Sequence, residues 1–308
     1  MLSPSDSSAI TDTVVRLIET NGIKFERGHP QKYFATLSQV NARLTLPIVP
    51  AEQLSTLVLL KNLYALWNFV VDDEIDREGT CRHLDASMQL LVHHSRGEPV
   101  PQQDSSAARV LQEFLSKLPA GPDKARLRDM ILFDFWIMAT GFKYEYAINK
   151  MTAAANSFEY CQYTTLVGSV VHFLDLDCLF SNQELAPATY RSMRVAYEHF
   201  GHAIKLASDI GSLKRELLEE DNLNLVRVKA LEAGLSGLER RLAGEAEYEA
   251  LKPRLQPMAV EVRKLATEHL ESAHAALAGI SDVDTKTVAG MFSKVAQEYF
   301  ERDMFFWK

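Results

Sequence analysis

One stretch of the chain constrains its fold and its chemistry more than any other. Leu66–Asp76 has the sequence LWNFVVDDEID, an apolar and aromatic run that ends in a cluster of acidic side chains. On a helix, Asp72 and Asp76 share one face because they are four residues apart, and Asp73 lies about 100° away. Like charges at this spacing repel, so a partner must compensate them. A hard divalent cation such as Mg²⁺, which takes oxygen ligands, is one candidate, and a solvated helix end with nearby arginines is the other.

The pattern of the whole chain is helical, and strand signals are almost absent. We expect a break in Ser157–Phe180 near Gly168, where weak helix formers cluster. Pro253 and Pro257 are expected to precede a long helix that ends near Leu277. Further helices are expected over 11–20, 31–44, 51–76, 83–94, 124–150, 187–219 and from 285 onward. Short connections and the lack of repeats predict one all-α domain.

Composition narrows the possible partners and compartments. The 308 residues carry a formal net charge of -8, which argues against a nucleic acid as partner. We expect no apolar run to reach the roughly 18 residues that a membrane span needs, so no membrane span is predicted. The N-terminus lacks the basic-then-apolar order of a secretory signal, which predicts a cytoplasmic protein. Cys81, Cys161 and Cys178 show no metal or disulfide spacing, so they are expected to be buried thiols.

A second oxygen-rich pattern lies in the segment from His202 to Val226. Ser208, Ser212 and Glu216 recur every four residues and therefore share one helical face. Taken alone, such a stripe is more often a solvated helix face than a site. Two acidic faces embedded in apolar helices are, however, what a site for several Mg²⁺ ions and a diphosphate would need. The cationic neighbours of this face are Lys205, Lys214 and Arg215.

The two patterns together resemble the motifs of bacterial class I terpene synthases. Residues 72–76, DDEID, match the DDxxD motif of that family. Residues 208–216, SDIGSLKRE, resemble its NDxxSxx(K/R)E motif, with Asp221 and Asn224 where a further tail is expected. Chain length and helical pattern agree, so the resemblance covers essentially the whole chain. It implies one class I catalytic domain over residues 1–308, an all-α bundle around a central active-site cavity.

The resemblance also implies roles for individual residues. Three Mg²⁺ ions are expected, with Asp73 and Asp209 orienting the ligands and their basic partners, and with Arg215 on the diphosphate. The metal-binding residues are expected to be Asp72, Asp76, Ser208, Ser212, Glu216 and Asp209. Lys205, Asn224 and Arg302 are expected to assist in substrate binding. Aromatic rings ease the charge of a carbocation, and the candidates for the cavity wall are Trp67, Phe69, Phe135, Trp136, Tyr163 and the terminal Phe305, Phe306 and Trp307. Each of these aromatic residues also fits an ordinary core position.

Three departures from the family pattern bear on the substrate. Ser208 stands where the family usually has Asn. Residues 160–165, YCQYTT, carry no Arg or Lys where the family usually has a diphosphate-sensing Arg. The usual Arg-Tyr pair near the C-terminus is missing, and Arg302 is the nearest substitute.

The implied activity is release of diphosphate from a prenyl diphosphate, followed by cyclisation or rearrangement of the carbocation. Kaurene-synthase-like enzymes of bacteria also tend to lack the sensing Arg, so a diterpene synthase acting on a copalyl-type or geranylgeranyl diphosphate is expected. A class II cyclase would then act earlier in the pathway, and a homodimer is reasonable. The alternatives are a farnesyl diphosphate-using sesquiterpene synthase, a chain-elongating isoprenyl diphosphate synthase, and a catalytically degenerate diphosphate-binding module. An elongating enzyme should carry a second DDxxD, which is absent here.

Overall fold

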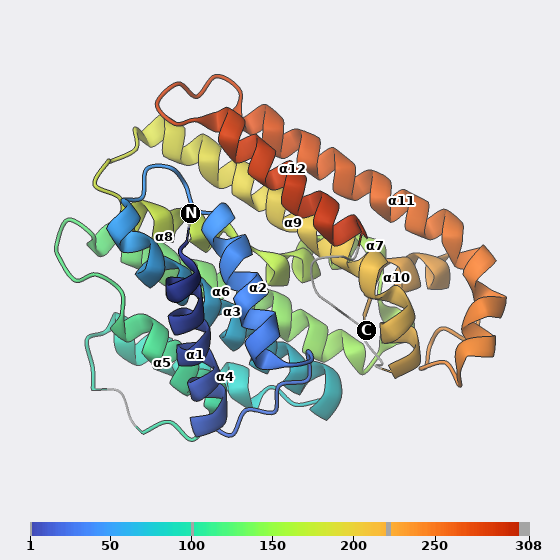
Figure 1. Ribbon diagram of the computed structural model, residues 1–308. Coiled ribbons are helices and arrows are strands. Elements are labelled where there is room, and N and C mark those ends of the chain that lie inside the picture. Colours follow the sequence, from blue (N-terminus) through green and yellow to red (C-terminus); the bar gives the residue numbers. More distant parts are fainter. Residues whose placement is uncertain (1, 100–101, 220–222, 302–308) are drawn as a thin grey trace.

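The computed structural model describes residues 2–99, 102–219 and 223–301 (Figure 1). These residues form twelve α-helices and no β-strand, which confirms the all-α fold. The α-helices span Pro4–Thr20 (α1), Pro30–Arg43 (α2), Leu54–Asp73 (α3), Arg82–Ser95 (α4), Ser106–Ser116 (α5), Ala125–Asn149 (α6), Ser157–Tyr163 (α7), Val171–Phe180 (α8), Pro187–Glu219 (α9), Leu225–Glu232 (α10), Glu245–Leu277 (α11) and Thr285–Glu301 (α12). Short 3₁₀ turns lie at Ala51–Gln53 (η1), Thr152–Ala154 (η3) and Thr164–Gly168 (η4), and a π-helical turn lies at Glu74–Glu78 (η2).

Helix α3 runs through the interior of the bundle. Its apolar residues point in all directions, and Leu57, Leu60, Leu63 and Leu66 are fully buried. It packs against α1, α2, α4, α5 and α8, while α9, α11 and α12 run alongside one another over another side of the molecule (Figure 1). A helix that is apolar all round is stable only when it is surrounded by protein. The acidic end of α3 is therefore held inside the bundle.

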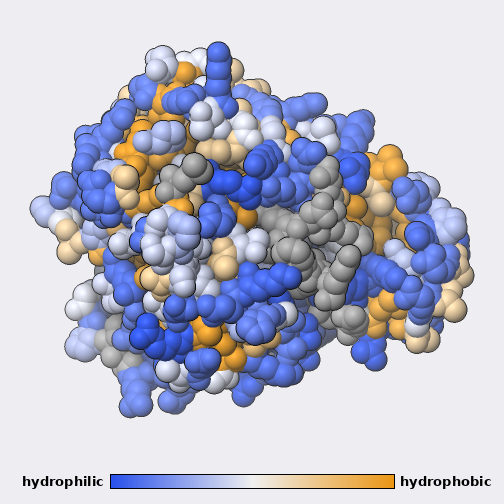
Figure 2. Space-filling model, in the orientation of Figure 1, coloured by the Kyte–Doolittle hydropathy of each residue, from blue (hydrophilic) through white to orange (hydrophobic). Residues whose placement is uncertain are grey.

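Two segments, Ala51–Glu78 and Ser157–Phe180, are long and apolar enough to span a membrane by length and composition. The expectation that no segment reaches this limit was therefore wrong. In the most apolar window of each segment, 67% and 72% of the residues are buried within the protein. Figure 2 shows a mostly hydrophilic face with smaller hydrophobic patches. Burial against neighbouring helices accounts for the composition of both segments.

The segment from Ser157 to Phe180 breaks where the sequence predicts it. Helix α7 passes into η4, and α8 begins only at Val171. Two glycines allow the break to lie against α9, because a Cβ on Gly201 would be 3.2 Å from the Gly168 carbonyl oxygen. The break thereby brings irregular backbone to the wall of the central cavity.

Two helix starts differ from the sequence prediction. Helix α1 begins at Pro4 rather than near Thr11, because the Ser3 hydroxyl caps it by accepting from the Asp6 N–H at 3.1 Å. Helix α11 begins at Glu245 and contains both Pro253 and Pro257. Each proline removes one helical hydrogen bond, but both are exposed, so water can satisfy the carbonyl oxygens that lose their donors.

Candidate active site

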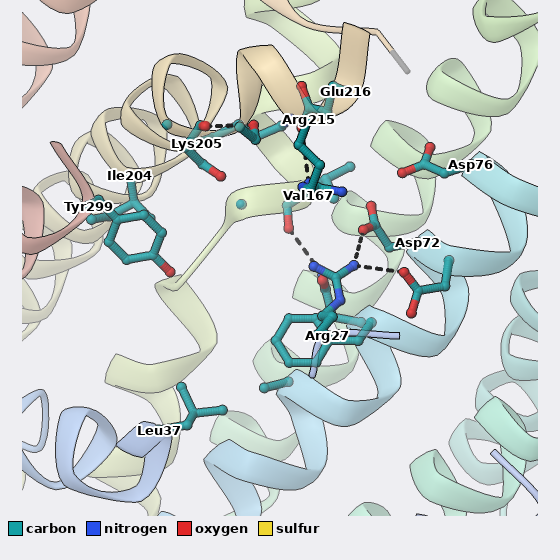
Figure 3. A pocket seen from close by; sticks show the side chains of 18 of the residues that line it. Arg27, Leu37, Asp72, Asp76, Val167, Ile204, Lys205, Arg215, Glu216 and Tyr299 are labelled. Atoms are coloured by element: carbon teal, nitrogen blue, oxygen red, sulfur yellow. Dashed lines mark hydrogen bonds and ion pairs between the residues drawn. The ribbon is translucent and has the colours of Figure 1, made fainter. Parts of the chain in front are cut away.

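A cavity of about 1170 Å³ lies between α2, α3, α6, η4, α8, α9 and α12. The two acidic patterns of the sequence meet in it. Asp72 and Asp76 face it from one side and Arg215 and Glu216 from another, whereas Leu37 lies at a distant end (Figure 3). Asp73, Ser208 and Ser212 also line this cavity. One end is therefore rich in oxygen ligands and the other is apolar.

The first motif does not continue as a regular helix. Helix α3 ends at Asp73, and the next five residues form the π-helical turn η2, so Asp76 does not stand one α-turn beyond Asp72. A wider turn separates the repelling carboxylates, and π-helical turns occur often at functional sites. The side chains of Asp72 and Asp73 are 25% and 19% exposed, which leaves both accessible from the cavity.

Glu74, inside the same motif, is turned away from the cavity and buried. Its Oε1 accepts from the Thr80 hydroxyl at 2.6 Å and from the Arg82 N–H at 3.0 Å. Its Oε2 accepts from the His83 N–H at 2.7 Å. These N–H groups belong to the first turn of α4, whose donors have no partner within the helix. Glu74 is thus the cap of α4.

Arg27, which the sequence analysis missed, reaches the first motif from the segment between α1 and α2. Its guanidinium forms an ion pair with Asp72, donates to Asp73 Oδ1 at 3.2 Å, and lies 4.4 Å from the centre of the Phe69 ring. Burial opposes its charge, but Asp72 and Asp73 outweigh burial and raise the pKa of Arg27. Only the fold brings Arg27 here, because 45 residues separate it from Asp72 and no motif includes it.

The second motif lies along α9 as the four-residue spacing predicts. Ser208, Ser212 and Glu216 all line the cavity. The Ser212 hydroxyl donates to the Ser208 carbonyl oxygen at 2.7 Å, and the Asn224 amide donates to Glu216 Oε2 at 2.6 Å. Burial is the main cause that raises the pKa of Glu216, so its charged form needs a cation nearby.

Asp209 lies behind this face, outside the cavity lining, and is 1% exposed. It accepts hydrogen bonds from the Tyr160 hydroxyl at 2.6 Å, from Lys205 Nζ at 3.0 Å and from the Leu225 N–H at 3.2 Å. These bonds tie α9 to α7 and α10. The position suits a residue that orients its neighbours better than it suits a metal ligand.

Glu145, on α6, is a further carboxyl that the sequence analysis missed. It lines the cavity between the two motifs, and its Oε1 lies 4.0 Å from Lys205 Nζ. Burial, opposed by Lys205 and aided by Asp72, Asp209 and Glu216, raises the pKa of Glu145 to about 8. A single glutamate on a buried aromatic helix was the signal in the sequence, because an isolated carboxylate is rarely buried without a role.

Of the aromatic residues that the sequence suggests for the cavity wall and that the structure describes, one lines the cavity and the others lie elsewhere. Phe69 lines the cavity. Trp67 and Phe135 instead fill the core, where the Trp67 indole donates to Ser87 Oγ at 2.9 Å. Trp136 is 41% exposed, and Tyr163 packs against Tyr144 away from the cavity. A helix presents neighbouring aromatic residues to different sides, so their proximity in sequence does not place them on one wall. The rings that line the cavity are Tyr33, Tyr64, Phe69, Phe173, Phe200 and Tyr299.

Arg302, Phe305, Phe306, Trp307 and Asp221 lie outside the described residues. Asn224 is buried as the N-cap of α10, where its side chain accepts from the Val226 N–H at 2.9 Å. It contacts Glu216 and the Asp209 backbone but is not part of the cavity lining.

The donor set fits a hard divalent cation. It consists of carboxylate and hydroxyl oxygens, and the Ser208 hydroxyl lines the cavity without a hydrogen bond to any described residue. Within residues 2–99, 102–219 and 223–301, no group of three or more His, Cys, Asp or Glu side chains is arranged to hold a metal ion. Mg²⁺ is usually held by one or two carboxylates, with water and substrate phosphates completing its shell. The residues present therefore suit Mg²⁺ and do not suit a zinc site closed by protein ligands.

Comparison with known proteins decides the family. Residues 64–240, more than half of the chain and including both motifs, match the sequence model described as terpene synthase family 2, C-terminal metal binding. This chain belongs to the terpene synthase family. A search of curated proteins finds no match. The family match assigns divalent metal use to this terpene synthase, and the fold is that of the class I enzymes.

Solved structures support the fold of this terpene synthase. Linalool/nerolidol synthase from Streptomyces clavuligerus, in complex with 2-fluorogeranyl diphosphate, has a TM-score of 0.68 at 15% identity and covers 100% of this chain and 99% of its own. Geranylgeranyl pyrophosphate synthetase from the archaeon Geoglobus acetivorans has a TM-score of 0.61 at 14% identity, covering 97% and 99%. Aristolochene synthase from Penicillium roqueforti has a TM-score of 0.56 at 16% identity, covering 100% and 95%. At these identities the likeness concerns the fold alone.

Proposed function

We propose that this terpene synthase ionises a prenyl diphosphate in a Mg²⁺-dependent reaction and guides the carbocation to a cyclised or rearranged product. The observation that carries the proposal is a single cavity in which both acidic motifs face an apolar end. Ionisation needs stabilisation of the departing diphosphate, and the carbocation needs protection from water. Such a cavity provides both.

Asp72 and Asp76 would hold metal ions on the side of α3, and Ser208, Ser212 and Glu216 on the side of α9, with three Mg²⁺ ions in all. Bound Mg²⁺ supplies Lewis-acid stabilisation of the charge on the leaving diphosphate. Asp73 and Asp209 would orient these ligands rather than bind metal. Two observations support these roles. The oxygen donors of both motifs meet in one cavity, and hydrogen bonds hold the Asp209 side chain on a face of α9 that does not line the cavity.

Cationic side chains would bind the diphosphate oxygens directly. Arg215 points into the cavity beside Glu216 (Figure 3). Lys205 lines the same cavity. Burial opposes its charge, but Asp209, Glu145, Glu216 and Tyr160 together outweigh burial and raise the pKa of Lys205, so this side chain stays charged. The Asn224 amide would keep Glu216 in place through its 2.6 Å hydrogen bond.

The aromatic wall would protect and stabilise the carbocation. Phe173, Phe200 and Tyr299 line the cavity together with Phe69. The negative face of a desolvated ring stabilises a nearby cation by up to about 2 kcal/mol. Their apolar surface also keeps water from the reacting carbon.

For the substrate we propose a copalyl-type or geranylgeranyl diphosphate, which makes the enzyme a diterpene synthase. Support comes from the cavity of about 1170 Å³ and from the absence of Arg and Lys in residues 160–165, as in kaurene-synthase-like enzymes of bacteria. Farnesyl diphosphate is the alternative substrate. We further propose one catalytic domain over residues 1–308 of bacterial type, a cytoplasmic location, a homodimer, and a class II cyclase that supplies the bicyclic substrate.

The test is incubation of purified protein with Mg²⁺ and, separately, farnesyl, geranylgeranyl and the copalyl diphosphate stereoisomers, followed by mass spectrometry of the extracted products. A product from a copalyl isomer alone would support the diterpene synthase and its partner cyclase. A cyclic product from geranylgeranyl diphosphate would keep the diterpene synthase without that partner. A product from farnesyl diphosphate alone would overturn the diterpene assignment.

Failure of every substrate would overturn the enzymatic proposal, and binding of Mg²⁺ and diphosphate without turnover would then indicate a degenerate module. Chelation of the metal by EDTA is the control for metal dependence. Product formation should stop when EDTA is added and resume when Mg²⁺ is restored in excess.

A further inference from the structure

Arg27 holds an unusual position for a cation in a metal-binding cavity. Its side chain is 14% exposed and rests on the Phe69 ring, and its guanidinium pairs with both Asp72 and Asp73. It comes from outside both motifs, from the segment that connects α1 and α2. A charge this deeply placed is retained only where its partners repay the loss of water.

The contacts of Arg27 conflict with metal binding at the same carboxylates. Asp72 is the first proposed metal ligand, and its Oδ2 already accepts from Arg27 Nη2. A guanidinium and a divalent cation that share one carboxylate oxygen repel each other strongly in a cavity with little water. Metal binding at Asp72 Oδ2 therefore requires Arg27 to release this oxygen.

The opposite side of the cavity indicates where Arg27 would go. In Figure 3 the guanidinium of Arg27 lies in the middle of the cavity, between Asp72 and the side chain of Arg215, which extends toward it from α9. Arg27 pairs with Asp72 and Asp73, and Arg215 lies 3.6 Å from Glu216, so an anion that enters the space between them would attract both guanidinium groups. Residues 160–165, in α7 and the start of η4, carry no cationic side chain and do not line this cavity.

We propose that Arg27 is a diphosphate-binding residue that rests on Asp72 and Asp73 in the metal-free enzyme and transfers to the diphosphate when metal ions take these carboxylates. The inference rests on the proposed function, since it assigns a residue to the same diphosphate. Arg suits both partners, because its planar group binds carboxylate and phosphate oxygens alike with two parallel hydrogen bonds. The transfer needs rotation of the side chain only, and no bond forms or breaks.

The test is calorimetric titration of the wild type and Arg27→Gln, first with Mg²⁺ alone and then with inorganic pyrophosphate in saturating Mg²⁺. Removal of the competing cation should tighten Mg²⁺ binding about tenfold, since one charge-assisted contact is worth about that much. Loss of the Arg27 guanidinium, which would bind the diphosphate, should weaken pyrophosphate binding about tenfold or more. Opposite signs for the two ligands are the signature of the transfer.

Arg194 provides a matched control. It too is a buried arginine that bridges two carboxylates, Asp134 at 2.7 Å and Asp175 at 2.5 Å, with a side chain that is 15% exposed. It lies outside the cavity. Arg194→Gln should lower the thermal unfolding midpoint as Arg27→Gln does, and should leave both affinities unchanged. Arg27→Lys is the second variant, and its affinities should lie between those of the wild type and Arg27→Gln because the charge is kept and the planar group is lost.

The outcomes separate this inference from the proposed function. A wild type that binds neither Mg²⁺ nor pyrophosphate overturns both. A wild type that binds both ligands, with a pyrophosphate affinity that Arg27→Gln leaves unchanged, overturns the inference alone and makes Arg27 a structural ion pair. Weaker binding of both ligands in Arg27→Gln also overturns it, because Arg27 would then support the fold of the site.

Discussion

At pH 7, where an exposed glutamate is ionised, Glu145 keeps its proton in the folded protein, because burial raises its pKa to about 8. The unfolded chain releases this proton near pH 4.5, so between these values the folded state binds more protons. The free energy of unfolding therefore falls as the pH rises from about 4.5 to 8.

Replacement of Glu145 by Gln removes this dependence. We expect the metal-free variant to gain stability relative to the wild type as the pH rises, by an amount on the order of a few kcal/mol at pH 8. Urea denaturation of both proteins at pH 5, 6.5 and 8 measures the difference. A constant difference across this range would contradict the raised pKa.

Asp72 offers a second prediction at the level of one side chain. Repulsion among the acidic residues would, by itself, make Asp72→Asn stabilising in a metal-free chain. Arg27 reverses that expectation, because the variant leaves the guanidinium without its closest partner. We expect a loss of about 1–3 kcal/mol in the free energy of unfolding and of at least about 100-fold in product formation. Asp85→Asn, at an exposed pair with Lys143, is the control and should change stability by less than about 0.5 kcal/mol.

Sequence alone was enough to find the residues of the proposed site that recur at helical spacing within a motif. Asp72, Asp76, Ser208, Ser212 and Glu216 lie within two motifs, and helical spacing is enough to group them. Arg27 and Glu145 could not be found in this way, since each reaches the site by packing of distant helices. Trp67 shows the opposite error, because closeness in sequence to Asp72 says little about which side of the helix a ring faces.

Helix α6 approaches η4 closely at Gly141, because glycine has no side chain. A Cβ on Gly141 of α6 would lie 2.7 Å from the Tyr163 carbonyl oxygen and 2.9 Å from Val167 Cγ2. This close approach lets α6 support the irregular backbone of η4, which forms part of the cavity wall. Gly290 of α12, in contrast, has open space around its added Cβ.

These two positions give a matched pair of substitutions. Gly141→Ala should lower the free energy of unfolding by about 1–3 kcal/mol because backbone atoms must shift. Gly290→Ala should raise it by up to about 1 kcal/mol, since alanine favours the helix and meets no obstacle. Thermal unfolding of both variants measures the effects. Equal shifts would show that helix propensity, not the contact with η4, controls Gly141.

Helices themselves were predicted well, because apolar periodicity is a local property. Their ends were predicted less well wherever distant or exposed groups decide them. The sequence predicts that Pro253 and Pro257 precede a helix, yet they lie inside α11, where water can satisfy the two carbonyl oxygens that lose their donors. The π-helical turn at Glu74–Glu78 was also missed, since no local pattern distinguishes it from a regular helix end.

At the scale of the whole molecule, the length of the cavity limits the length of the hydrocarbon chain that a substrate can have. Leu37 of α2 lies at an end of the cavity distant from Asp76 and Glu216 (Figure 3). A substrate whose diphosphate is held at the acidic end would direct its hydrocarbon part toward Leu37.

Leu37→Trp should therefore shorten the cavity. We expect kcat/KM for a twenty-carbon diphosphate to fall at least about tenfold more than kcat/KM for farnesyl diphosphate. The reason is that the longer hydrocarbon would clash with the larger Trp side chain, and overpacking of a close-packed wall costs free energy. Product analysis with both substrates measures the ratio. Leu37→Met, of similar volume, is the control and should preserve it. A ratio unchanged in the Trp variant would mean that the hydrocarbon lies elsewhere.

Glu74 gives the first motif a structural role in addition to the proposed metal binding. It stands among the acidic residues of the proposed metal site, yet its side chain caps α4 through Thr80, Arg82 and His83. We therefore expect selection at this position to act on folding rather than on catalysis. Among natural relatives, Glu74 should vary together with residues 80–83, and should vary independently of the side chains that line the cavity.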